Sequence, residues 1–196
     1  MAGGRIVLLR HGETEWSRSG KHTSRTDVPL TEHGRERATG IRPLLRSFLG
    51  DGSPALVLSS PRRRARDTAE LAGLSAEVDP LLAEWDYGDH EGQTTPEIRE
   101  TVPGWTVWTH PCPGGESAEQ VSARAERVLA QARAALDGGD VVLVGHGHFS
   151  RVLVARWVGL PATEGVRFAM DAGCVTVLGH ERGVPRIDHL NLGGRP

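Results

Sequence analysis

Three short apolar runs, separated by stretches of helical periodicity, constrain the fold of this chain more than any other feature. Continuous apolar runs of this length are typical of strands that are buried on both faces, as in a parallel sheet. Strands that alternate with helices favour an α/β fold, a three-layer α/β/α sandwich in which helices cover both faces of a mostly parallel sheet. The runs occupy residues 5–9 (RIVLL), 55–59 (ALVLS) and 141–144 (VVLV).

The stretches between these runs carry helical spacing and recognisable start signals. Thr31 is expected to cap the first helix, and Ser117 with Gln120 forms a capping-box pattern at the start of the third. Two later runs, at 173–178 and 186–190, have the β-branched composition of strands. The predicted helices cover residues 31–48, 61–71, 117–136 and 149–158.

Length and composition narrow the organisation and the partners that we expect. No linker-like tract divides the 196 residues, so we expect a single domain over 1–196. The formal net charge of -2 gives no overall attraction to nucleic acid or to anionic membranes. No apolar stretch approaches the ~20 residues that span a bilayer, and no signal-peptide pattern opens the chain. We therefore expect a soluble, cytoplasmic protein without nucleic-acid or membrane partners, in which Cys112 and Cys174 stay reduced.

Charged residues follow each of the three apolar runs. Arg10 and His11 follow the first run, three arginines at 62–64 lie shortly after the second, and His146 and His148 lie just beyond the third. Ligands of such sheets bind beyond the carboxyl ends of the strands, so we expect these side chains to meet there. A neutral imidazole can act as a nucleophile, and arginine forks match phosphate oxygens. The set predicts a pocket for a phosphoryl group that needs no metal ion and no cofactor.

Five motifs then occur in a fixed order: RHGETEW, TDVPLTEHGRERA, SSPRRRARDTA, LAEWDYGDHEG and VGHGHFSR. From residue 5 to about residue 155, the chain resembles the histidine phosphatase superfamily, also called the phosphoglycerate mutase-like family. The resemblance implies a phosphoglycerate mutase-like fold and the branch that contains broad-range acid phosphatases and a sugar bisphosphatase. It also implies a small phosphomonoester as substrate.

The resemblance assigns roles to the residues that hold the phosphoryl group. The histidine of the RHG motif, which is transiently phosphorylated in the family, corresponds to His11, and the arginine beside it to Arg10. Arg64 corresponds to the arginine of the family's S-x-x-x-R-A pattern, and His146 corresponds to the histidine of the later HG motif. The neighbouring Arg62 is not among the implied ligands.

The family's proton donor is the first acid of an E-x-x-x-G-x-x-E-G pattern. This position falls on Glu84, and Gly88, Glu91 and Gly92 complete the pattern. The apolar residues around Glu84, with Trp85 directly after it, are expected to favour the protonated carboxyl that a proton donor needs.

Residues near the implied pocket are expected to contact the substrate. Ser17 stands where relatives often have Asn, so the resemblance does not fix the identity of the substrate. Trp105 and Trp108 lie in a segment that covers the pocket in relatives, and ordinary packing under a loop is an equally weighted alternative for them. The expected phosphate and substrate contacts are Ser17, His22, Thr23, Trp85 and Gly147.

Three other functions stay open at the level of sequence. His146 and His148 have the spacing of paired metal ligands, but no third ligand stands at a familiar spacing. A cofactor-dependent phosphoglycerate mutase would carry an arginine after the acid, where this chain has Trp85. A regulatory member that binds phosphorylated ligands without turnover is also compatible with the motifs. Dimers are common among relatives, so a homodimer is an expectation by resemblance.

Overall fold

A mixed sheet of six strands lies at the centre of the computed structural model, which describes residues 3–50 and 52–193. The strand order is β3-β2-β4-β1-β5-β6, and neighbours among the first four strands run parallel. The last two strands join antiparallel at the β1 edge. The strands are β1 (Ile6–Arg10), β2 (Leu56–Ser59), β3 (Glu77–Val78), β4 (Val141–Gly145), β5 (Val175–Glu181) and β6 (Val184–Leu192).

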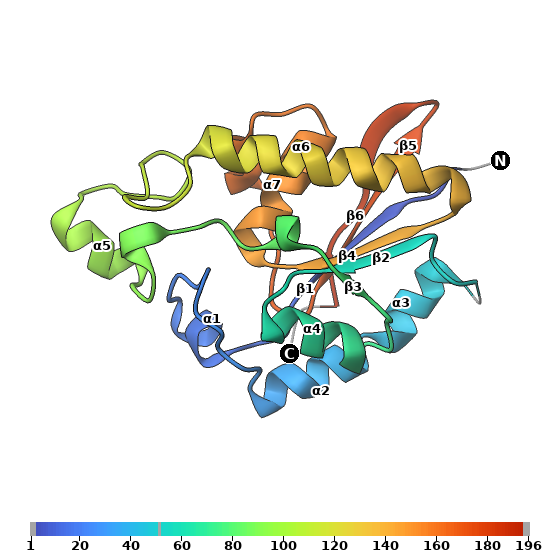
Figure 1. Ribbon diagram of the computed structural model, residues 1–196, viewed down its shortest axis with the longest axis horizontal. Helices are drawn as coiled ribbons and strands as arrows, with labels where there is room; N and C mark the ends of the chain where they lie inside the picture. The colour runs from blue at the N-terminus through green and yellow to red at the C-terminus, as the bar shows by residue number, and fades with distance from the viewer. Residues whose placement is uncertain (1–2, 51, 194–196) are drawn as a thin grey trace.

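Helices cover both faces of this sheet, which confirms the predicted three-layer α/β/α arrangement (Figure 1). Side chains alternate along β1: Ile6 and Leu8 pack toward one layer of helices, and Val7 and Leu9 toward the other. Because a strand with two apolar faces must be covered twice, the continuous run in β1 requires both layers. The first layer contains α6 (Ala118–Ala135) and α7 (Gly147–Trp157); the second contains α2 (Glu32–Gly40), α3 (Arg42–Leu49) and α4 (Arg63–Leu71).

Two predicted helix starts are confirmed. The Thr31 hydroxyl accepts a hydrogen bond from the Gly34 N–H at 3.0 Å and caps α2. Ser117 and Gln120 form the predicted reciprocal capping box of α6, with N···O distances of 2.8 and 3.2 Å. These side chains satisfy N–H groups that a helix start leaves unpaired.

The prediction of one helix over 31–48 is wrong, because the chain breaks at Ile41 between α2 and α3. Pro43 lies in the first turn of α3. Proline lacks the N–H that would continue α2, and its ring clashes with the carbonyl four residues earlier. The chain therefore starts a new helix at this point.

Other boundaries shift by two residues, and short elements appear that the sequence did not predict. α4 begins at Arg63, two residues later than predicted, and α7 begins at Gly147, two residues earlier than predicted. The short helices α1 and α5 both begin with a capping box, built on Thr14 and Thr94. The unpredicted elements are α1 (Glu15–Ser19), β3, α5 (Thr95–Thr101), and the 3-10 turns η1 (Pro80–Leu82), η2 (Gly88–His90), η3 (Leu136–Gly138) and η4 (Ala162–Arg167).

The sheet brings the chemistry-bearing segments to one edge. In the register of the parallel strands, Arg10 lies opposite Gly145, and Ser59 lies opposite Val144. The loops after β1, β2 and β4 therefore leave the sheet side by side. Across residues 3–50 and 52–193, no helix is long and apolar enough to cross a membrane. Cys112 and Cys174 are both buried free thiols.

Candidate active site

His11 directly follows β1 and is 5% exposed. Its Nδ1 lies 2.7 Å from the carbonyl oxygen of Gly12. Because a carbonyl oxygen only accepts hydrogen bonds, Nδ1 carries the proton, and the lone pair of the neutral ring lies on Nε2. Burial, followed by the charges of Arg64 and Arg10, holds the pKa of His11 well below its usual value. The ring is therefore neutral and has the tautomer of a nucleophile that attacks through Nε2.

His146 directly precedes α7 and packs edge-on against His11, with 5.2 Å between ring centroids. Its Nε2 lies 2.7 Å from the Ser60 hydroxyl, which comes from the loop after β2. Burial, followed by the charges of Arg64 and other nearby groups, holds the pKa of His146 well below its usual value. The loops after β1, β2 and β4 thus meet at this pair of rings.

Arginine side chains surround the two histidines. Arg64 is fully buried in the first turn of α4, and its terminal nitrogens donate to the carbonyls of Thr26 and Thr23 at 2.9 and 3.1 Å. Arg10 donates to the Met170 carbonyl at 2.5 Å. A Cβ on Gly147 would lie 3.2 Å from the Arg10 guanidinium carbon, so a glycine at that position makes room for the side chain.

Buried side-chain nitrogens without a hydrogen-bond partner in the protein are concentrated at this site. Buried polar groups in native proteins almost always have partners, so a cluster of exceptions indicates where a ligand binds. The arginine N–H groups among them match the oxygens of a phosphoryl group. Within the described part of the chain, the unpartnered atoms are Nε of Arg10, Nε of Arg62, Nε of Arg64 and Nδ1 of His146.

Glu84 lies between η1 and η2, is 7% exposed, and accepts hydrogen bonds from three backbone N–H groups. Its Oε1 accepts from Trp85 at 2.9 Å and from Phe149 at 2.7 Å, and its Oε2 accepts from His148 at 3.0 Å. Leu82 and Trp85 are buried beside it, as the sequence predicted, but the N–H donors from the first turn of α7 were not predicted. The first turn of α7 thus fixes the position of the carboxyl group.

Arg124 on α6 holds the loop that carries Glu84. It donates to the carbonyls of Leu81, Ala83 and Glu84 at 2.7 to 3.3 Å. It also forms an ion pair with Glu116 at 2.6 Å. One guanidinium thereby satisfies several carbonyls that would otherwise be unpaired in a loop without regular structure.

A cavity of about 260 Å³ opens beside these groups. Arg64 and His146 are fully buried and do not line it. The predicted residues that line it are Arg10, His11, Ser17, His22, Thr23, Glu84 and Gly147. The lining residues that the sequence did not single out as contacts include Lys21, Tyr87, Thr95, His148, Arg151 and Met170.

The prediction that Trp85 contacts the substrate is wrong. Its ring is 1% exposed, does not line the cavity, and packs edge-on against Trp108 in the core. Trp105 and Trp108 are also buried behind the lining residues, so packing is the role that the structure gives them. The large apolar ring of Trp85 fills space in the core beside Glu84.

Imidazoles and a phenol form a buried layer on one side of the cavity. The Tyr87 hydroxyl lies 2.6 Å from Nδ1 of His148, and the His22 ring stacks on the His148 ring at 5.8 Å. Burial, followed by the charge of His90, lowers the pKa of His22 to about 4. Burial also lowers the pKa of His148 well below its usual value. These rings are therefore neutral near neutral pH and present a polar but uncharged wall.

The two histidines of the H-x-H pair have different neighbours. His146 contacts Ser60 and His11, whereas His148 contacts Tyr87 and His22. Over the described ranges, no group of three or more His, Cys, Asp or Glu side chains is arranged to hold a metal ion.

Comparison with known proteins identifies the family of this site. A family model described as the histidine phosphatase superfamily (branch 1) matches residues 6–193. The chain belongs to the histidine phosphatase superfamily. This histidine phosphatase is 51% identical to an acid phosphatase of Mycobacterium tuberculosis, over 98% of this chain and 94% of that protein. The resemblance that the five motifs indicated is thereby confirmed, and the protein is a phosphatase.

A further relative and a solved structure support the same family and fold. A sedoheptulose 1,7-bisphosphatase of Saccharomyces cerevisiae is 34% identical to this histidine phosphatase, over 80% of this chain and 68% of that protein. The solved structure of a protein from Mycobacterium tuberculosis, 50% identical, superposes with a TM-score of 0.94 over 98% of this chain and 99% of that one. The predicted phosphoglycerate mutase-like α/β fold is confirmed.

Proposed function

We propose that this enzyme hydrolyses small phosphomonoesters by the acid phosphatase reaction, through a phosphohistidine at His11 and with Glu84 as the proton donor. The observation that carries the proposal is the hydrogen bond from His11 Nδ1 to the Gly12 carbonyl, which leaves the lone pair on Nε2. The buried cationic nitrogens around it supply the positive charge that a phosphoryl group in transfer needs.

In the first step, Nε2 of His11 attacks phosphorus and the ester P–O bond breaks. Glu84 gives its proton to the leaving alcohol oxygen. The guanidinium groups of Arg10 and Arg64 neutralise charge on the equatorial oxygens. The Gly12 carbonyl accepts the hydrogen bond from Nδ1–H throughout, and it stabilises the positive charge that the ring gains when its Nε2 is phosphorylated.

In the second step, water attacks phosphorus and the P–N bond breaks. The Glu84 carboxylate takes the proton of the water, which returns both residues to their starting states. The electron pair of the broken P–N bond returns to Nε2 of His11, and orthophosphate leaves. Since arginines balance the charge on phosphate, the reaction has no step that needs a metal ion.

The cavity supports a small, polar substrate. Lys21 and Arg151 line it together with the hydroxyl-bearing Ser17 and Thr95. Such a lining suits the body of a phosphorylated metabolite or a sugar phosphate better than an apolar alcohol. The names of the two curated relatives, an acid phosphatase and a sedoheptulose 1,7-bisphosphatase, agree with this class.

Replacement of His11 by Ala tests the mechanism. We expect kcat for p-nitrophenyl phosphate to fall by at least ~10³-fold, because the covalent route disappears. Labelled substrate should leave an acid-labile phosphoenzyme on the wild-type chain and none on the variant. His33→Ala, at an exposed position on α2, is the control and should keep full activity. Hydrolysis by His11→Ala at the wild-type rate would falsify the proposal.

The substrate class needs a separate measurement. Phosphorylated metabolites, including triose, heptulose and nucleotide monoesters, should be ranked by kcat/KM from acid to neutral pH. We expect sugar phosphates to rank above nucleotide monoesters, because the polar side chains of Lys21, Arg151 and Ser17 that line the cavity can bind sugar hydroxyls. Nucleotides at the top of that ranking would contradict the assignment.

A further inference from the structure

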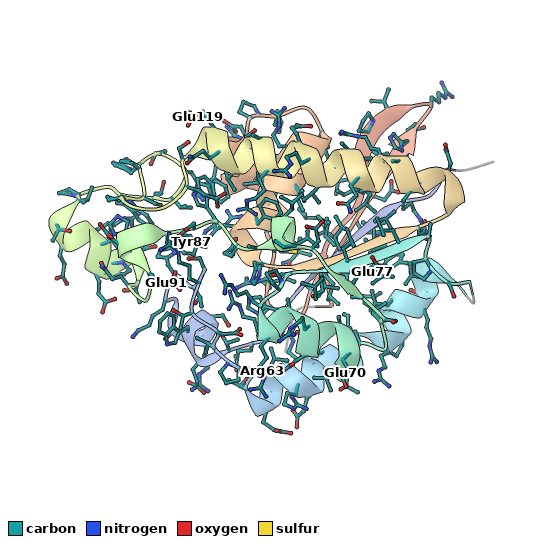
Figure 2. All side chains as sticks on the ribbon, viewed as in Figure 1. Arg63, Glu70, Glu77, Tyr87, Glu91 and Glu119 are labelled. Atoms are coloured by element: carbon teal, nitrogen blue, oxygen red, sulfur yellow. The ribbon has the colours of Figure 1, made fainter. Side chains whose placement is uncertain are left out.

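Glu91 directly follows η2, and every hydrogen bond that its carboxylate accepts comes from one loop, at Ser24 and Thr26. Oε1 and Oε2 accept from the Ser24 N–H at 3.0 and 2.9 Å. Oε2 also accepts from the Ser24 hydroxyl at 2.5 Å, and Oε1 accepts from the Thr26 N–H at 2.9 Å. In Figure 2, Glu91 lies near Tyr87 at the end of the molecule that carries α1 and α5.

The bonds from this loop favour the ionised form of the carboxyl group. Burial alone would raise the pKa of Glu91, but the hydrogen bonds from Ser24 and Thr26 outweigh burial and hold the pKa below its usual value. Across residues 3–50 and 52–193, no Lys or Arg forms an ion pair with Glu91. The N–H and hydroxyl groups of the loop therefore stabilise the carboxylate directly, and Arg25 of the same loop, which pairs with Asp86, adds a longer-range attraction.

The same loop holds the guanidinium of Arg64. Thr23 and Thr26 give their carbonyl oxygens to the two terminal nitrogens of Arg64, at 3.1 and 2.9 Å. The amide groups that Glu91 binds and the carbonyls that Arg64 binds thus belong to one short segment, 23–26. Since a guanidinium is planar, two fixed carbonyls set its orientation, and its Nε is left for the phosphoryl group.

The loop is also tied to the segment that runs on from Glu84. The Tyr87 N–H donates to the Ser24 hydroxyl at 3.4 Å. His22 pairs with the chain beside Glu91, because its carbonyl accepts from the Gly92 N–H and its own N–H donates to Gln93, both at 2.8 Å. Glu91 therefore lies where the proton-donor segment and the loop that orients Arg64 are joined.

We propose that Glu91 is a positioning residue for the reaction: its carboxylate shapes the loop 23–26 so that Arg64 is aimed at the phosphoryl group. The inference rests on the proposed function, because it requires Arg64 to bind that group. Glu91 itself does not line the cavity, so it acts only through the loop and Arg64.

The test is a comparison of Glu91→Gln with Glu97→Gln. Glutamine keeps the size of the side chain, but it turns one acceptor oxygen into an NH₂ group that faces the N–H donors of the loop. Glu97 accepts from Thr94 in an exposed capping box and has no link to Arg64, so it is a matched control. We expect kcat/KM for p-nitrophenyl phosphate to fall on the order of 10-fold to 100-fold in Glu91→Gln, as for small misplacements of catalytic groups. The inhibition constant of orthophosphate should rise in parallel, whereas both values stay unchanged in Glu97→Gln.

A double-mutant cycle separates positioning from general damage to the fold. Arg64→Lys keeps the charge but cannot reach both carbonyls of the loop. In that background, Glu91→Gln should reduce kcat/KM by less than about 2-fold, because its effect passes through the Arg64 guanidinium. The same loss in both backgrounds, or an equal loss in Glu97→Gln, overturns the inference. If Glu91→Gln does not fold, Ser24→Ala takes its place in the cycle; it removes the 2.5 Å contact with Glu91 and the longer 3.4 Å contact with the Tyr87 N–H, and it keeps the backbone N–H bonds to Glu91.

Failure of the proposed function has a different result. Full activity and unchanged orthophosphate inhibition in Arg64→Lys alone would show that Arg64 does not bind the phosphoryl group. Loss in Arg64→Lys together with wild-type behaviour of Glu91→Gln would leave the proposed function intact and overturn the role of Glu91.

Discussion

Gly12 and Gly34 lie backbone against backbone, and this contact sets the position of the nucleophile's loop. A Cβ on Gly12 would lie 2.4 Å from the Gly34 carbonyl oxygen, and a Cβ on Gly34 would lie 2.2 Å from the Glu13 carbonyl oxygen. Neither distance is compatible with a side chain. The start of α2 thus supports the Gly12 carbonyl that accepts a hydrogen bond from His11, and a glycine in the second motif takes part in the chemistry of the first.

Replacement of Gly34 by Ala should therefore affect both stability and activity. Because the clash is with backbone atoms, we expect the free energy of unfolding to fall by about 1–3 kcal/mol and kcat/KM to fall with it. Gly40→Ala, in the same helix, meets nothing within 4 Å and is the control. Urea denaturation and steady-state kinetics of both variants provide the measurement. Wild-type values for Gly34→Ala would show that the two segments can separate freely.

Glu84→Gln should separate substrates by their leaving groups. Glutamine keeps an oxygen for the Trp85 and Phe149 N–H groups, but it has no acidic proton that it could transfer to the leaving oxygen. We expect kcat for alkyl phosphates to fall about 10²–10⁴-fold, and kcat for p-nitrophenyl phosphate to fall far less, since nitrophenolate leaves without a proton. Glu13→Gln is the control, because Glu13 lies two residues after the nucleophile. It should change kcat by the same factor for both substrates. An equal loss on both substrates in Glu84→Gln would argue against its role as the proton donor.

The parts of the fold that sequence predicts well are those with a strong local signal. Continuous apolar runs placed β1, β2 and β4 to within one residue, and polar caps placed the starts of α2 and α6. β3 was missed because it consists of two exposed edge residues with no periodicity. α5 does carry a local signal, since Thr94 and Glu97 have capping-box spacing.

The site was harder to predict because much of it is backbone. The motifs indicated Arg64 and Glu84, but their partners are the carbonyls of Thr23 and Thr26 and the N–H groups of His148 and Phe149. Every residue carries such groups, so sequence gives no sign of which ones converge. Whether a tryptophan such as Trp85 lines a pocket or fills the core likewise depends on packing that no local pattern encodes.

The buried histidines predict how stability depends on pH. His11, His22, His146 and His148 all have folded-state pKa values below the unfolded value, chiefly through burial. The unfolded chain then binds more protons below about pH 6.5, so acid favours unfolding. For His22, stability is lost as pH falls from 6.5 toward about 4, by up to ~1.4 kcal/mol per pH unit.

Thermal unfolding across this pH range provides the check. The slope of stability against pH should be smaller in His22→Asn and unchanged in His33→Asn, because His33 is exposed. Orthophosphate should stabilise the wild-type chain more at acid pH than at neutral pH, because its negative charge favours protonation of the histidines nearby. A stability that rises on acidification, or the same slope in His22→Asn, would contradict the burial of these rings as neutral groups.

The structure and the family motif disagree about whether Arg62 belongs to the phosphate site. The family pattern does not imply it as a ligand, yet its Nε is buried without a partner, as are those of Arg10 and Arg64. The backbone N–H of Arg62 also donates to the Ser60 hydroxyl at 3.3 Å, beside His146, and the charge of Arg62 helps to lower the pKa of His146.

We therefore expect Arg62 to contribute to phosphate binding. Loss of a hydrogen bond to a charged group removes about 1.5–3 kcal/mol, so Arg62→Ala should raise the inhibition constant of orthophosphate by roughly 10-fold or more. The adjacent Arg63 has the same charge but is exposed and pairs with Asp67, so Arg63→Ala should leave that constant within about 2-fold of wild type. Equal effects of the two substitutions would mean that net charge, and not the buried Nε, governs phosphate affinity.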